Sequence, residues 1–265
     1  MPNSDTASNS GTEQSAQLPA FIERPDGEHI AYIKTEGDKD LPGIVFLGGY
    51  MSDMTGSKAT ALEEFAIKNN QCFVRFDYMG HGQSSGKFTD GTIGRWTEDA
   101  LAIIDQLTVG PQILVGSSMG GWIMLNAALK RPDRTKALVG IAAAPDFTQD
   151  LMWDTFTPEI KDTLLNDGVY YEPSEYGDEP YAITLNLIEE GRQHLLLGKK
   201  QPIDCPVRLI QGVKDADVPW QVATKILESL RTEDVELILV KDGDHRLSGP
   251  KDLERLCKTI KEVSC

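Results

Sequence analysis

A short stretch between two apolar runs has the composition of a catalytic turn. Residues 116–120 read Gly-Ser-Ser-Met-Gly, which is a G-x-S-x-G pattern centred on Ser118. With Ser117 at the centre, neither flanking position would be glycine. A strand that turns sharply into a helix brings backbones close together, and glycine leaves the space for it. Such a turn exposes the central hydroxyl above a sheet, so Ser118 is the candidate nucleophile, with a plain turn as the alternative.

A serine hydroxyl is a weak nucleophile at neutral pH and needs a neighbouring base. Of the four histidines, His245 follows the apolar run 235–240 and precedes a helical pattern. Its loop should therefore reach the carboxyl edge of the predicted sheet, where the candidate serine also emerges. His29 and His81, in a hairpin and a glycine-rich loop, are expected to be structural, and His194 to be a packing or solvent-facing residue that could touch substrate. We expect His245 to be the base.

An orienting carboxylate fixes the tautomer of the imidazole and stabilises its charged form. Residues 210–220 read IQGVKDADVPW and offer Asp215 and Asp217 directly after a strand pattern. The order serine, aspartate, histidine along the chain is the one expected of this architecture. We favour Asp215, with Asp217 as a solvated neighbour. Asp242 and Asp244, which flank the histidine, are expected to belong to a turn.

The tetrahedral intermediate of an acyl transfer needs two hydrogen-bond donors for its oxyanion. One is expected to be the backbone N–H of Met119, at the N-terminus of a helix whose amides favour negative charge. The other is expected from the loop 48–56, which reads GGYMSDMTG and follows an apolar run. We assign the backbone N–H of Tyr50. Both donors are main-chain groups, so the two side chains are expected to matter less.

Apolar runs of strand length alternate with amphipathic segments along the chain. The runs are rich in Val, Ile and Leu, as in strands buried on both faces of a parallel sheet, and cover residues 43–47, 72–76, 112–116, 137–142, 207–211 and 235–240. Helical periodicity covers residues 58–68, 95–107, 121–130, 218–230 and 251–263. Residues 20–35 predict a hairpin that turns at Pro25-Asp26-Gly27. The series predicts an α/β fold with a mostly parallel, doubly wound sheet.

The segment 146–204 interrupts this alternation. It contains no clear strand pattern, yet it is too rich in aromatic and aliphatic residues for a solvated loop of its length. We expect a small helical cap, inserted before the last two strands, that covers a pocket at the strand ends. A helical pair that only covers the sheet is the alternative. Residues 20–265 are expected to form one domain that carries this insertion.

Composition narrows the classes of partner. The net charge of −15 argues against a nucleic-acid surface, which needs clustered Lys and Arg. No run of 18 apolar residues occurs, so no transmembrane segment is expected. The four cysteines form no CxxC pattern and no cluster with histidine, so we expect unpaired thiols in a reducing compartment. Neither a metal nor a cofactor is expected.

The first 19 residues are polar and low in complexity, which predicts a disordered segment. They lack the apolar core of a signal peptide. They contain acidic residues and no arginine, which argues against a mitochondrial presequence. On these grounds we expect a cytoplasmic protein.

Together these residues resemble the α/β-hydrolase family over about residues 20–263. The stretches GPQILVGSSMGGW, DCPVRLIQGVKDADVPW and GDHR are similar to one branch, as are PGIVFLGGYMSDMTGSKA and FVRFDYMGHGQSSG. Members of that branch act as mitochondrial palmitoyl-protein thioesterases and acyl-glucuronide esterases. The resemblance implies an α/β-hydrolase fold with an eight-stranded sheet, and a triad of Ser118, Asp215 and His245.

The sequence therefore predicts a serine hydrolase that cleaves acyl thioesters or esters through an acyl-enzyme. The substrate would be a small molecule or an S-acylated protein with an apolar acyl chain, as for a palmitoyl-protein thioesterase. Alternatives are a carboxylesterase for small or acyl-glucuronide esters, a carbon–carbon bond hydrolase, and a non-catalytic binding protein of this fold. The oligomeric state is left open.

Overall fold

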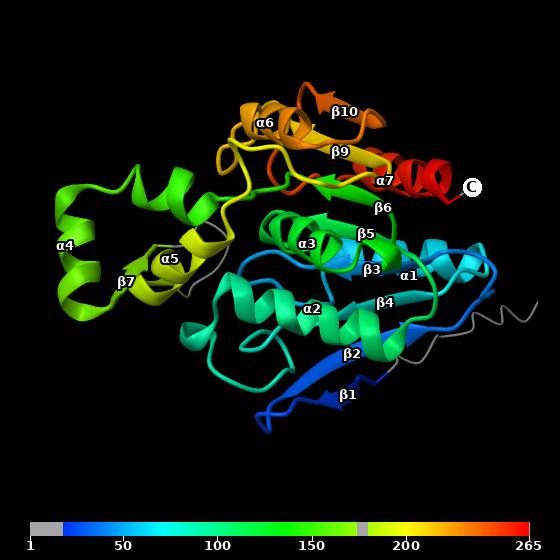
Figure 1. The fold of residues 1–265 in the computed structure, drawn as a ribbon, viewed down its shortest axis with the longest axis horizontal. Coiled ribbons are helices and arrows are strands. Elements are labelled where there is room, and N and C mark those ends of the chain that lie inside the picture. Colours follow the sequence, from blue (N-terminus) through cyan, green and yellow to red (C-terminus); the bar gives the residue numbers. More distant parts are fainter. Residues whose placement is uncertain (1–17, 174–179, 265) are drawn as a thin grey trace, which may run out of the picture.

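An eight-stranded sheet forms the centre of the computed structural model in Figure 1, which describes residues 18–173 and 180–264. The strand order is β1-β2-β4-β3-β5-β6-β9-β10. The six strands from β4 to β10 in this order run parallel to one another, whereas β2 is antiparallel to both β1 and β4. The strands are β1 (Ala20–Glu23), β2 (His29–Thr35), β3 (Gly43–Leu47), β4 (Phe73–Phe76), β5 (Gln112–Ser117), β6 (Thr135–Ile141), β9 (Val207–Gly212) and β10 (Val235–Val240).

Alternate residues of the central strands divide the apolar core into two layers. On β5, Leu114 packs in one cluster with side chains of α2, α3 and α6, whereas Ile113 and Val115 pack in a second cluster with α1 and α7. Helices therefore cover both faces of the sheet, as Figure 1 shows. These helices are α1 (Ser57–Lys68), α2 (Ile93–Leu107), α3 (Met119–Lys130), α6 (Gln221–Ser229) and α7 (Pro250–Val263). The predicted α/β fold with a doubly wound, mostly parallel sheet is confirmed.

The predicted hairpin at the start of the described chain is also present. Strands β1 and β2 pair antiparallel, with Ala20 opposite Tyr32 and Glu23 opposite His29. Gly27 has a φ of +85°, which glycine adopts without strain. The side chain of Asp26 accepts a hydrogen bond from the N–H of Glu28 and so closes the turn.

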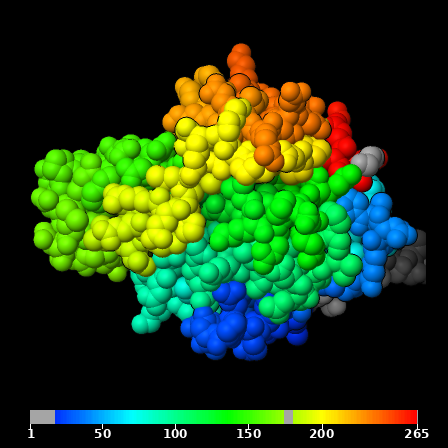
Figure 2. Space-filling model, in the orientation of Figure 1, coloured from blue at the N-terminus to red at the C-terminus, as the bar shows by residue number. Residues whose placement is uncertain are grey.

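The segment between β6 and β9 forms a lobe that stands out from the body of the molecule, in green and yellow at the left of Figure 2. This cap contains α4 (Pro158–Asp167), α5 (Leu185–Gly191) and short helical turns at Thr148–Trp153 and Arg192–His194. It also contains two strands, β7 (Val169–Glu172) and β8 (Tyr181–Thr184), which pair antiparallel as a separate sheet. Leu164, Ile183 and Ile188 form a small core of its own.

The expectation that residues 146–204 hold no strand was wrong. Strands β7 and β8 have four residues each, and they pair only with one another. No residue of β7 is fully buried, whereas Ile183 of β8 packs against Leu164 and Ile188 in the core of the cap. A four-residue strand carries too little periodicity to be distinguished from a helical segment in the sequence.

Two expectations lie wholly or partly outside the described residues. The polar N-terminal segment falls on residues 1–17 for most of its length. Cys72, Cys205 and Cys257 are free thiols, whereas Cys265 is not described. In the described part of the chain, no helix is both long and apolar enough to cross a membrane.

Candidate active site

Ser118 stands at the junction of β5 and α3, in a strained backbone conformation. Its φ of 54° and ψ of −120° lie in a region that L-residues rarely adopt. Its N–H donates to the carbonyl of Ile141 on β6, and its carbonyl accepts from the N–H groups of Gly121 and Ala144. The turn is therefore fixed by hydrogen bonds on both sides. Ser117, by contrast, is a buried strand residue opposite Ile141.

The two glycines of the pattern are required by close backbone contacts. A Cβ on Gly116 would collide with the carbonyl of Gly120, and a Cβ on Gly120 would collide with the carbonyls of Leu47 and Gly48. The second contact joins the serine turn to the loop after β3. The glycines therefore bring the predicted nucleophile and the predicted oxyanion loop together.

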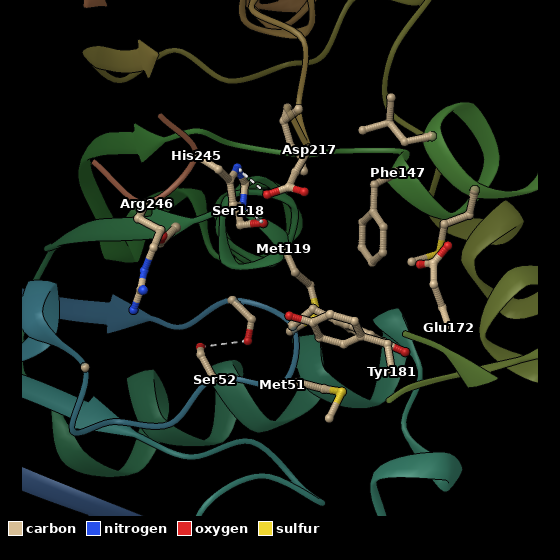
Figure 3. Close-up of a pocket in the computed structure, with 18 of the residues that line it drawn as sticks. Met51, Ser52, Ser118, Met119, Phe147, Glu172, Tyr181, Asp217, His245 and Arg246 are labelled. Atoms are coloured by element: carbon tan, nitrogen blue, oxygen red, sulfur yellow. Dashed lines mark hydrogen bonds and ion pairs between the residues drawn. The ribbon is translucent and has the colours of Figure 1, made fainter. Parts of the chain in front are cut away.

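His245 and Asp215 complete a hydrogen-bonded chain with Ser118, as Figure 3 shows for the serine and the histidine. The Nε2 of His245 lies 3.1 Å from the Oγ of Ser118. Its Nδ1 lies 2.9 Å and 3.1 Å from the two carboxylate oxygens of Asp215. The side chain of Asp215 is fully buried, whereas that of His245 is 19% exposed. The structure thus brings the three predicted residues together from the loops after β5, β9 and β10.

The carboxylate of Asp215 is held by donors on three sides. Its Oδ1 accepts from the N–H groups of Asp217 and Val218 at 3.0 and 2.8 Å. Its Oδ2 accepts from the side-chain amide of Gln211 at 2.8 Å. These donors fix the position of the carboxylate, which suits a group that orients an imidazole. Gln211 was missed in the sequence, where its one signal is a polar residue inside the apolar strand β9.

The aspartate loop and the histidine loop are also joined through their backbones. The N–H of Lys214 donates to the carbonyl of Gly243 at 2.9 Å. A Cβ on Gly212 would collide with the carbonyls of Gly243 and Asp244, so only glycine allows the two loops to approach this closely. Asp244 accepts from the N–H of Leu247, as expected of a turn residue.

The other candidate residues from the sequence do not belong to the chain of Ser118, His245 and Asp215. Asp217 is more exposed than Asp215, and one of its oxygens lies 4.0 Å from Nδ1 of His245. Asp215, Asp217 and His245 are also the only described group of three metal-ligating side chains. Their atoms already bind one another, so the group is the same site as the hydrogen-bonded chain. His29 packs against Phe21 in the hairpin.

The remaining two histidines lie apart from this chain. His81 is buried, and burial lowers its pKa to about 4. His194 belongs to the cap, where its Nε2 lies 2.6 Å from a carboxylate oxygen of Glu190. Neither ring reaches Ser118 or His245 through a hydrogen bond, so neither competes as the base.

The loop after β3 passes close to Ser118, and side chains of and next to β4 fix its shape, which the sequence did not predict. The N–H of Met54 donates to a carboxylate oxygen of Asp77, and the carbonyl of Met54 accepts from the guanidinium of Arg75. Arg75 in turn pairs with Glu63 on α1 at 2.8 Å. These contacts fix the position of the loop that contains Tyr50.

Met119 is the first residue of α3, and amides in a first helical turn have no acceptor within the helix.

The side chain of Tyr50 makes contacts that the sequence did not predict. Its hydroxyl donates to the carbonyl of Ala182 on β8 at 2.7 Å, which ties the oxyanion loop to the cap. Its ring packs edge-on against Phe88, Trp96 and Phe147. Burial raises the pKa of this phenol above its usual value, so the hydroxyl stays protonated. These contacts give the side chain a structural role, whereas its part in oxyanion binding stays as predicted, through the main chain.

A cavity of about 720 Å³ opens at Ser118 and His245. On one side it is lined by Tyr50, Met119 and mostly apolar residues of the cap. The cap contributes Phe147, Leu151, Met152, Phe156, Ile160 and Tyr181, together with the polar residues Thr155, Thr157 and Glu172. On the other side it is lined by polar residues of the β3 loop, of the start of α1 and of the histidine loop. In Figure 3, Ser118 lies between Arg246 on one side and Phe147 and Tyr181 on the other. The serine thus stands where an apolar half and a polar half of the cavity meet.

Comparisons with known proteins agree with this architecture. A family model described as the alpha/beta hydrolase fold matches residues 58–178. The human protein "Palmitoyl-protein thioesterase ABHD10, mitochondrial" is 42% identical over 245 residues, which cover 92% of this chain and 79% of that protein. The bovine protein of the same name is 42% identical over 247 residues, with the same shares covered.

Two solved structures are similar over nearly the whole chain. The mouse α/β hydrolase domain-containing protein 10 superposes with a TM-score of 0.86 at 40% identity, covering 93% of this chain and 98% of that one. A protein from Agrobacterium vitis superposes with a TM-score of 0.90 at 40% identity and the same coverage. The chain is a hydrolase of the α/β-hydrolase family. Within that family it belongs with the ABHD10 proteins.

The expected cytoplasmic location was wrong. The mammalian relatives at 40–42% identity are named as mitochondrial proteins. The expectation rested on the composition of the first 19 residues. That composition predicts how the segment interacts with water, but it does not determine the compartment of the folded domain.

Proposed function

We propose that Ser118 is the nucleophile of this hydrolase, His245 its general base and Asp215 the carboxylate that orients the base. The observation that carries the proposal is the continuous chain from Ser118 Oγ through the imidazole to a buried carboxylate, with contacts of 3.1 and 2.9 Å. In this chain the hydroxyl of Ser118 donates to Nε2, and Nδ1–H donates to Asp215. The carboxylate stabilises the imidazolium that forms when the serine proton is taken.

The first step is attack of the Ser118 oxygen on the acyl carbonyl, with transfer of its proton to His245. The resulting oxyanion is bound by the backbone N–H groups of Met119 and Tyr50. His245 then gives its proton to the departing thiol or alcohol. The same histidine next activates water, which releases the acid and restores the serine.

The substrate is proposed to be an acyl thioester with a long apolar chain, such as a palmitoylated cysteine of a protein. Of the nine cap residues that line the cavity, six are apolar or aromatic, which suits an acyl chain. Relatives at about 42% identity are named palmitoyl-protein thioesterases. A short oxyester would leave most of this surface in contact with water.

Labelling with a fluorophosphonate, followed by intact mass, tests the nucleophile. The parent, Ser117→Ala and Ser118→Ala would be compared, each with a palmitoyl thioester and a short-chain oxyester as substrates. We expect one adduct on the parent and on Ser117→Ala, none on Ser118→Ala, and turnover only where labelling occurs.

Two results would contradict the proposal in different ways. Labelling and turnover by Ser118→Ala would refute the assignment of the nucleophile. A parent that labels and cleaves the short oxyester, but leaves the palmitoyl thioester intact, would replace the thioesterase with a carboxylesterase.

A further inference from the structure

The polar half of the cavity carries two cations next to the proposed base. Arg246 follows His245 directly in the chain, and Lys58 lies in the first turn of α1. Both line the cavity, together with Ser52, Asp53, Ser57 and Ser248. In Figure 3 the guanidinium of Arg246 extends past Ser118 on the side away from Phe147 and Tyr181. This is the side left for a leaving group when the acyl chain lies under the cap.

Lys58 occupies a position that is unfavourable for a cation. Partial positive charge gathers at a helix N-terminus, and the first turn of α1 has no acidic residue to offset it. The ammonium of Lys58 donates to the carbonyl of Arg246 at 2.6 Å and lies 3.4 Å from Oγ of Ser248. Lys58 therefore fixes the backbone of Arg246 and with it the loop that carries His245.

The two cations also repel one another. Burial and, to a lesser degree, the charge of Arg246 lower the pKa of Lys58 to about 8, whereas Asp244 and Asp252 oppose the shift. A chain with a net charge of −15 thus holds two positive charges together in its cavity. An anion bound beside them would relieve this repulsion.

The acids close to this pair are engaged by other groups. Asp53 accepts from the N–H and the hydroxyl of Thr55 at 2.7 and 2.6 Å. Asp244 accepts from the N–H of Leu247, and Asp252 pairs with Arg255 at 2.6 Å. Each carboxylate therefore has partners of its own besides the cations.

We propose that Arg246 and Lys58 form a subsite for a carboxylate carried by the leaving group, close to the sulfur or oxygen that departs. This inference rests on the proposed function. The planar guanidinium of Arg246 binds a carboxylate through two parallel N–H donors, while Lys58 supplies a fixed second charge. A monoanionic carboxylate fits better than a dianionic phosphate, because Asp53 and Asp217 line the same cavity.

Because the subsite lies next to His245, it can bind only the part of the substrate near the departing atom. His245 gives its proton to the departing atom, so Arg246 lies beside the part of the substrate that follows that atom. A free acidic thiol, or an acylated cysteine with an acidic neighbour, has a carboxylate within reach. The subsite selects among leaving groups, and the cap side selects among acyl chains.

The test compares two thioesters that differ only in charge. Octanoyl thioesters of 3-mercaptopropionate and of 3-mercaptopropionamide share the acyl chain and the shape of the thiol. We expect the parent to favour the carboxylate over the amide by about tenfold in kcat/KM, which is typical of a charge-assisted hydrogen bond. Arg246→Gln should reduce this preference to about one and leave the amide within about twofold of the parent.

Further variants separate binding of the anion from general damage. Arg246→Lys should keep part of the preference, because lysine keeps the positive charge but lacks the two parallel N–H donors of the guanidinium. Lys58→Met should lower the preference and also slow the amide, since it frees the backbone of Arg246. Lys214→Gln is the matched control, because this exposed lysine pairs with Asp242 and is not among the residues that line the cavity. It should change neither rate.

The outcomes distinguish this inference from the function on which it rests. A parent that cleaves both thioesters equally would overturn the subsite and leave the thioesterase intact, as would an Arg246→Gln variant with the parent's preference. A parent that cleaves neither thioester would overturn the proposed function itself. A preference that survives in high salt unchanged would also count against the subsite, because salt screens exposed charges.

Discussion

The carboxyl edge of the main sheet and the cap are built in different ways. At the sheet edge, each proposed catalytic side chain lies in the loop or turn that follows a parallel strand, and hydrogen bonds join the three side chains to one another. Asp215 alone accepts from two backbone amides, from Gln211 and from His245. The cap has a small core of its own, although its Phe147 and Leu187 pack in the core of the body. A few polar contacts also join the cap to the body.

Those contacts come from widely separated parts of the chain. Tyr50 donates to Ala182, the N–H of Gly94 donates to Glu190, and the indole of Trp122 donates to the carbonyl of His194. The difference teaches that chemistry and selectivity belong to separate parts of the molecule. Changes at the sheet edge should alter kcat for every substrate, whereas changes in the cap should alter the choice of acyl chain.

The sharpest test at the sheet edge is Asp215→Asn. The amide cannot stabilise the imidazolium and favours the wrong tautomer, so kcat should fall by about 10⁴-fold for short and long acyl chains alike. Initial rates with a matched series of thioesters measure this. Asp217→Asn is the control and should cost no more than about threefold, because this carboxylate lies 4.0 Å from Nδ1 and is 41% exposed. A larger loss in Asp217→Asn would reverse the assignment.

Acid should lower the stability of the body through the buried His81. Burial lowers the pKa of His81 to about 4 in the folded protein, against the 6.5 of a histidine exposed to water. Between these values the unfolded chain binds more protons, so the free energy of unfolding falls as pH drops from 6.5 to 4. The loss should approach about 3 kcal/mol at the acid end.

Urea unfolding at several pH values measures this dependence. In His81→Gln the part of the slope between pH 6.5 and 4 that comes from His81 should disappear, whatever the variant's stability at neutral pH. His194→Gln removes a half-buried histidine of the cap and serves as the comparison. Parallel curves for the parent and His81→Gln would show that His81 does not titrate in this range.

The cap is tested by Phe156→Ala. Phe156 lines the apolar half of the cavity and packs against Tyr170. Loss of its ring should remove about 1–1.5 kcal/mol of contact with a long chain, which lowers kcat/KM for a palmitoyl thioester about tenfold. A butyryl thioester should change less than twofold. Leu165→Ala is the control, since Leu165 is 58% exposed and is not among the residues that line the cavity. Equal losses for both chain lengths would contradict the division of roles.

The smallest effect is expected where the two regions meet. Tyr50→Phe removes the hydroxyl that donates to Ala182 and leaves the ring in place. The free energy of unfolding should fall by about 1 kcal/mol, because a buried carbonyl loses its partner. Since the proposed oxyanion donor is the backbone N–H, kcat should stay within about twofold. Tyr171→Phe, at a half-exposed tyrosine of β7, is the control for stability. A large loss of kcat would show that the hydroxyl itself takes part in catalysis.

The sequence by itself determined the class of fold and the residues that could do chemistry. The parallel strands follow from continuous apolar runs and the helices from a periodicity of 3.6 residues, and both signals are local. The G-x-S-x-G pattern is local too, and it singled out Ser118 over Ser117 because a strand–turn–helix junction needs glycine at fixed spacings. Asp215 and His245 followed from the order of the strands, since parallel strands end at one edge. Their catalytic roles stay a prediction until the variants are measured.

Only the tertiary structure decided what surrounds those residues. The hydroxyl of Tyr50 meets the carbonyl of Ala182 across 132 residues of chain, and Lys58 meets Arg246 across 188. No local pattern specifies such contacts, because they depend on how whole elements pack. The strands β7 and β8 are likewise stabilised by the cap around them rather than by their own four-residue sequences. The physical reason is range: periodicity acts along a few residues, whereas the shape and polarity of the cavity arise between elements that are distant in sequence.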